Sequence, residues 1–131
     1  MKRYVLTLAL LCLIPWVVPA NGLPSSVLKS IPLAQLYWGK DTCGKLRVIV
    51  SPLNMPSQPN GLFTAGYTLP LKCLIVLNPA FIENVPDWLI CEAVLHEYGH
   101  ITGHHHVLDV RKIMFRQLGR HHYPCRSRFT N

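Results

Sequence analysis

The sequence predicts a single small domain of the α+β class. Its 131 residues suffice for one domain and no more. Half of the residues are hydrophobic and 15% are charged, a composition typical of globular chains and not of disordered ones. Short β-branched runs come first and one strong helical pattern follows them, an order of elements that indicates α+β.

Residues 1–20 have the three parts of a secretory signal peptide. Two basic residues follow the initial methionine, residues 4–18 are apolar, and small residues before position 21 offer a cleavage site. The apolar run is too short for a typical membrane span, although an uncleaved anchor or a buried helix remains the alternative. We therefore predict a secreted or periplasmic protein without stable insertion into the membrane.

The mature domain, residues 21–131, would carry a positive charge. It holds 11 Lys and Arg against 6 Asp and Glu, a formal charge of +5, with much of the excess beyond residue 110. Such a patch could favour acidic substrates, nucleic acid or an anionic surface, and a solvated basic tail is the simpler interpretation. Aromatic residues do not interleave with the basic ones, so we expect no nucleic-acid partner. We expect a monomer.

The first half of the domain predicts one helix and one strand. Ser25 to Tyr37 has apolar residues at helical spacing, interrupted by Pro32, which indicates a short or broken helix. The β-branched run from Leu46 to Val50 predicts a strand. Three prolines between Pro52 and Gly61 predict a loop.

The second half predicts two strands and then a helix. Leu62–Tyr67 and Leu71–Leu77 have strand composition. A helix over about 86–103 follows, opened by proline and aspartate and ended by Gly103, which takes a left-handed conformation cheaply. The segment beyond Met114 has no clear period, so we expect it to be irregular.

Four cysteines remain in the mature chain. They are Cys43, Cys73, Cys91 and Cys125. In an oxidising compartment an even number of cysteines suggests two disulfides, and four cysteines allow three connectivities. We favour the pairs Cys43–Cys73 and Cys91–Cys125. No CxxC motif is present, which argues against a cysteine zinc site or a thioredoxin-like protein.

The stretch HEYGHITGHHH concentrates the chemistry of the chain. His96 and His100 stand one helical turn apart on one face, where two imidazoles can bind one zinc ion. Glu97 lies beside the first histidine, the place of a general base that acts on zinc-bound water. Gly103 lets the chain turn out of the helix and bring His106 to the same ion, leaving a fourth position for water.

Other interpretations of the histidines stay open. His104 or His105 could compete with His106 for the third position if the turn is atypical. A histidine-rich surface that binds metals loosely would explain the histidines, but it would not explain Glu97 and Gly103.

The string HExxHxxGxxH resembles the zinc signature of the metzincin metallopeptidases. Asp109 and Met114, in HVLDVRKIM, stand where the matrixin branch commonly has an aspartate and a methionine. The resemblance covers His96 to Met114. It implies a zincin-like fold with a small mixed sheet, an active-site helix over about 86–103, and a turn at Met114 beneath the metal. Arg116 departs from the pattern, because some metzincins have a tyrosine there.

The resemblance also implies a function. It predicts a secreted zinc-dependent metalloendopeptidase that hydrolyses peptide bonds, with Zn²⁺ held by His96, His100 and His106. Glu97 would be the general base on a zinc-activated water, and a peptide or protein substrate would lie extended along an edge strand, for which Leu71–Leu77 is the candidate. The alternative is a module of the same fold that binds zinc or a surface without catalysis.

Overall fold

The computed structural model describes residues 22–52, 64–119 and 123–129. The predicted signal peptide, residues 1–20, therefore lies outside the described residues, as does most of the predicted loop from Pro52 to Gly61. The elements are α1 (Ser25–Trp38), β1 (Arg47–Val50), β2 (Gly66–Leu69), a 3₁₀ turn (Pro70–Lys72), β3 (Leu74–Leu77), α2 (Pro79–Asn84), α3 (Asp87–Ile101) and α4 (Tyr123–Phe129). These helices and strands confirm the predicted α+β class.

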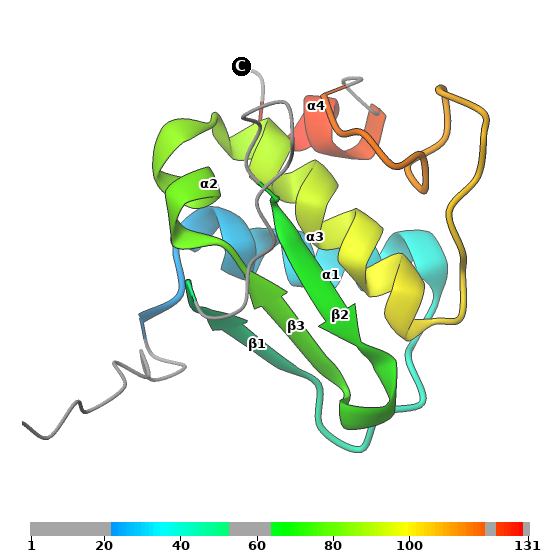
Figure 1. Ribbon diagram of the computed structural model, residues 1–131. Coiled ribbons are helices and arrows are strands. Elements are labelled where there is room, and N and C mark those ends of the chain that lie inside the picture. Colours follow the sequence, from blue (N-terminus) through cyan, green and yellow to red (C-terminus); the bar gives the residue numbers. More distant parts are fainter. Residues whose placement is uncertain (1–21, 53–63, 120–122, 130–131) are drawn as a thin grey trace, which may run out of the picture.

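The three strands form one mixed sheet with the order β1-β3-β2. Strand β1 pairs with β3 in parallel, and β2 pairs with β3 in antiparallel orientation. Figure 1 shows α1 and α3 on one face of this sheet. The central strand β3 is the most buried of the three, with Ile75, Val76 and Leu77 all at most 2% exposed.

The prediction that Leu71–Leu77 is an edge strand is wrong. Its second half is β3, which has hydrogen-bonded neighbours on both sides, because a continuous apolar run suits a strand buried on both faces. Its first two residues belong to the 3₁₀ turn Pro70–Lys72, and Cys73 follows in the left-handed region at φ 47°. The edge strand beside α3 is β2, which begins at Gly66, later than predicted.

Two helices also differ from expectation. Helix α1 runs unbroken through Pro32, although proline removes a main-chain donor and usually kinks or breaks a helix. Its packing against α3 through fully buried residues such as Val27 and Ala34 offsets that cost. The segment beyond Met114 is not wholly irregular, since α4 forms at residues 123–129 and packs on α3.

The core is built around α3, which contacts α1, the sheet and α4. Ten of its fifteen residues are buried. Both favoured disulfides are confirmed, with Cα–Cα distances of 5.8 Å for Cys43–Cys73 and 5.6 Å for Cys91–Cys125. Among the helices of the described residues, none has the length and apolarity needed to cross a membrane.

Candidate metal centre

The C-terminal half of α3 carries His96, Glu97 and His100. The helical repeat places the two imidazoles on adjacent turns, with ring centroids 5.0 Å apart. His106 completes a nearly equilateral triangle, at 5.0 Å from the His96 ring and 4.8 Å from the His100 ring. One potential ligand nitrogen from each of the three histidines lies within 4.8 Å of the others, so this group could hold one metal ion.

Gly103 is the point where the chain leaves the helix. It has φ 90°, which side chains rarely adopt, and its N–H donates to the carbonyl of His100. The next residue, His104, donates its main-chain N–H to the carbonyl of Gly99, which closes the turn. The chain then returns alongside the helix, and His106 meets His96 with 3.0 Å between their Nε2 atoms. Nitrogens bound to one tetrahedral zinc lie roughly 3.3 Å apart, given Zn–N bonds of about 2.05 Å.

This turn selects His106 among the three candidates for the third position. The imidazole of His104 packs on Trp38, with ring centroids 4.3 Å apart, and is not in the metal-binding group. His105 is exposed beside the cleft and also lies outside the group.

Main-chain carbonyls orient two of the histidines. His96 Nδ1 lies 2.8 Å from the carbonyl oxygen of Ile113, and His100 Nδ1 lies 2.8 Å from that of His104. A carbonyl can only accept, so each Nδ1 carries a hydrogen, and Nε2 is the ring nitrogen that can bind a metal when the imidazole is neutral. Such outer hydrogen bonds fix the tautomer and the ring orientation of metal-binding histidines in general.

The three histidines differ in how deeply they are buried. His96 is 6% exposed, His100 is intermediate, and His106 is exposed. The pKa of His106 is lowered by partial burial and by the nearby His100 and Arg116. A lowered pKa keeps the imidazole neutral, the form in which histidine binds metals.

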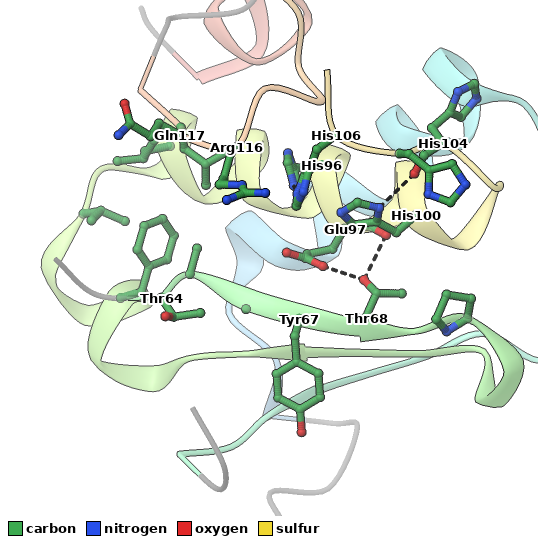
Figure 2. A pocket seen from close by; sticks show the side chains of 18 residues that line it. Thr64, Tyr67, Thr68, His96, Glu97, His100, His104, His106, Arg116 and Gln117 are labelled. Atoms are coloured by element: carbon green, nitrogen blue, oxygen red, sulfur yellow. Dashed lines mark hydrogen bonds between the residues drawn. The ribbon is translucent and has the colours of Figure 1, made fainter. Parts of the chain in front are cut away.

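Glu97 points into the same space and is 8% exposed. Burial raises the pKa of its carboxyl to about 7, although a hydrogen bond from Thr68 opposes the shift. Figure 2 shows the carboxylate between the histidines of α3 and the strand that carries Thr68. A carboxyl group with a pKa near neutrality can both take and release a proton at physiological pH.

Met114 lies in a tight turn against α3. The N–H of Phe115 donates to the carbonyl of Lys112, and the turn presents the Ile113 carbonyl to His96. The Met114 side chain is 3% exposed, and a Cβ at Gly99 would collide with its sulfur. Gly99 thus allows the turn to approach the helix closely. Tyr98 faces away from the histidines, is fully buried and donates to the carboxylate of Asp41.

A cleft with a volume of about 870 Å³ runs along the histidines. Strand β2 forms one wall, and residues 116–118 form the opposite one. Between them the lining is mainly apolar, with Phe81, Val85 and Leu89. Figure 2 shows Arg116 on the same side of the cleft as His96 and His106.

Asp109 does not contact the histidines. Its carboxylate accepts hydrogen bonds from the main chain and the guanidinium of Arg111, which lower the pKa of Asp109 to about 2. This geometry fits a residue that caps the turn. The remaining two histidines, His121 and His122, lie outside the described residues.

No protein family model, curated protein or solved structure matches this chain. The resemblance to metzincins therefore rests on the residues from His96 to Met114.

Sequence reasoning missed three contributors to the site. Thr68 lay outside both predicted strands of the second half, yet in the structure it belongs to β2 and reaches Glu97. The carbonyls of Ile113 and His104 leave no signal in the sequence, because any residue supplies a carbonyl. Only the fold shows where these groups point.

Proposed function

We propose that this chain is a secreted zinc-dependent metalloendopeptidase. The observation that carries the proposal is the convergence of His96, His100 and His106 around one point, with the buried carboxyl of Glu97 beside them. Three imidazoles without a thiolate are typical ligands of a catalytic zinc that keeps an open position. A carrier of metal ions has no need of a carboxyl group held next to its ligands.

Zinc is among the metals that fit this donor set. The ligand group consists of imidazoles only, which suit zinc, copper, iron and nickel better than calcium or magnesium. The exposed edge of His106 leaves room for a water molecule and a substrate. When bound there, zinc would polarise a substrate carbonyl and make a water molecule more acidic.

The protein's own groups would do the rest of the work. Glu97 accepts a proton from the attacking water and donates it to the nitrogen of the leaving amine. Strand β2 borders the cleft, and none of the strands in the described residues pairs with its outer edge. An extended peptide would hydrogen-bond to that edge, which replaces Leu71–Leu77 as the candidate docking strand.

Secretion is part of the same proposal. The two disulfides fit an oxidising compartment, and the predicted signal peptide over residues 1–20 would direct export.

The test combines metal analysis with activity. The mature chain is produced in an oxidising compartment, its zinc content is measured by elemental analysis, and a mixed peptide library is incubated with it, with and without a chelator. We expect one zinc ion per chain and cleavage that the chelator abolishes. Glu97→Gln is the matched variant, and we expect it to keep zinc while cleavage falls by about 10²–10⁴-fold. Zinc without cleavage would favour the non-catalytic module instead.

A further inference from the structure

Thr68 connects the edge strand of the sheet to the candidate general base. It lies on β2, and its hydroxyl oxygen is 2.5 Å from Oε2 of Glu97 and 3.0 Å from the main-chain oxygen of the same residue. Figure 2 marks both interactions and shows that Tyr67, the preceding residue, points to the other side of the strand. The alternation of side chains along a strand gives Thr68 its direction toward α3.

The Glu97 carboxyl has few other ways to be held in place. Among the described residues, Thr68 supplies the hydrogen bond that its carboxyl group makes. The glutamate side chain has three rotatable bonds and is buried, so a fixed partner decides where the carboxyl points. Because Oε2 is engaged by Thr68, Oε1 is the oxygen left for a water molecule at the metal-binding group.

We propose that Thr68 is a positioning residue, whose hydroxyl holds the Glu97 carboxyl in the orientation needed to take a proton from water. The inference rests on the proposed function and adds a residue to it. Thr68 touches neither the metal-binding nitrogens nor the reacting atoms, and it acts through Glu97 alone.

A hydroxyl is suited to this task in both halves of the reaction. Before proton transfer, Thr68 donates its hydrogen to the carboxylate. After Glu97 has taken the proton, the same oxygen can accept a hydrogen bond from the acid while its hydrogen turns to the Glu97 carbonyl. Thr68 gains and loses no proton overall, and the carboxyl keeps a partner throughout.

The competing explanation is that Thr68 only joins β2 to α3. A structural role would show as a loss of folding stability, with the turnover of the folded enzyme unchanged. Thr68→Val separates the two explanations, since valine has nearly the same shape, favours strands and lacks the hydroxyl. Thr68→Ser restores the hydroxyl without the methyl group.

Thr102→Val is the matched control. The Thr102 hydroxyl also donates to a main-chain carbonyl of α3, that of Gly99, at 3.0 Å, but it makes no contact with Glu97. The control therefore removes a similar bond through the same change of side chain. Its expected turnover is that of the wild-type protein.

The experiment measures kcat, KM and zinc content for the zinc-loaded proteins with a peptide taken from the library screen. We expect Thr68→Val to lower kcat by at least about tenfold, with zinc content unchanged and KM within about twofold. Thr68→Ser should recover most of the rate. If Thr68→Val does not fold, Thr68→Ala is measured in its place against the same serine variant.

Two outcomes would overturn the inference, and they can be told apart. If the wild-type protein cleaves peptides, Glu97→Gln does not, and Thr68→Val keeps the wild-type kcat, then the proposed function stands and only the role of Thr68 is lost. If the zinc-loaded wild-type protein cleaves nothing, the proposed function fails and the inference fails with it.

Discussion

The two faces of α3 are built for opposite purposes. One face carries Cys91, Leu95 and Tyr98, which are fully buried against other parts of the fold. The other face carries His96, Glu97 and His100, which line the cleft. The first face lowers the free energy of the folded state by packing, whereas the second gathers polar groups that gain little from burial. The packing of one face thus fixes the position of α3, and the other face is left to line the cleft.

This contrast between the two faces of α3 shows how a small domain can carry a buried carboxyl group. Burial raises the pKa of Glu97 because the charged form loses its hydration, and this opposes folding at neutral pH. The packed face and its disulfide offset that cost. Groups that serve a function are commonly kept at the expense of stability.

The largest effect should come from removing the Cys91–Cys125 disulfide, which lies on the packed face of α3. The variant Cys91→Ala with Cys125→Ala should lose about 2–5 kcal/mol of unfolding free energy, measured by denaturant titration. The matched control removes Cys43 and Cys73, whose half-buried bridge closes a loop of similar length, 30 residues against 34. Loop entropy is then nearly equal, so the larger loss should follow the buried pair. Equal losses of unfolding free energy in the two variants would mean that the buried disulfide stabilises the fold no more than the half-buried one.

The next largest effect should be on zinc affinity, with the packed face of α3 unchanged. His106→Ala should weaken zinc binding by more than about 100-fold in calorimetric titration, because it removes one of three ligands. The control His105→Ala should change the affinity little. The unfolding free energy of the metal-free protein should stay close to wild type in both variants, since both side chains are exposed. A large loss of affinity in His105→Ala would mean that the turn after Gly103 brings in another histidine.

A third effect should have the opposite sign, a gain in stability. The pKa of Glu97 in the metal-free fold is raised from 4.5 to about 7, so the folded state binds a proton more tightly than the unfolded state. Folding stability therefore falls as the pH rises from about 4.5 to 7 and stays low above that. Glu97→Gln removes the penalty and should stabilise the metal-free protein by at most about 3 kcal/mol at pH 8.

The pH dependence is the control for this prediction. At pH 5 the gain should shrink to roughly 1 kcal/mol or less, because the folded wild-type protein then carries a neutral Glu97. Thermal unfolding of both proteins at the two pH values measures the difference. A gain that does not change with pH would show that the carboxyl charge is not its source.

The smallest effect should occur where the helix meets the turn of Met114. Gly99→Ala places a methyl group against the Met114 sulfur and should cost about 1–3 kcal/mol of unfolding free energy through overpacking. Gly44→Ala is the control, because a Cβ there meets nothing within 4 Å. A neutral Gly99→Ala would mean that the turn can move away from α3 without cost.

Much of the site was predictable from local spacing. The His96–His100 pair follows from the helical repeat, and Gly103 marks the exit from the helix. Both favoured disulfides, Cys43–Cys73 and Cys91–Cys125, are also present. These features depend on residues whose type alone restricts what they can do, such as a glycine at positive φ.

Other features depended on tertiary packing and were missed or misplaced. The strand Leu71–Leu77 was expected at the edge, and half of it is the central strand β3. Propensity identifies a strand but says nothing about its neighbours in the sheet, because strand order is decided by which faces become buried. Pro32 likewise indicated a break in a helix that packing against α3 holds together.

By itself the sequence determined the α+β class and the helix with its histidine pair and carboxyl group, because these follow from short-range periodicity and from side-chain chemistry. Tertiary structure decided which histidine completes the group, which strand borders the cleft, and that Thr68 reaches Glu97. The strand beside the cleft and the Thr68–Glu97 contact join residues far apart along the chain. Their distances depend on how α1, α3 and the sheet pack as one core, which local patterns do not encode.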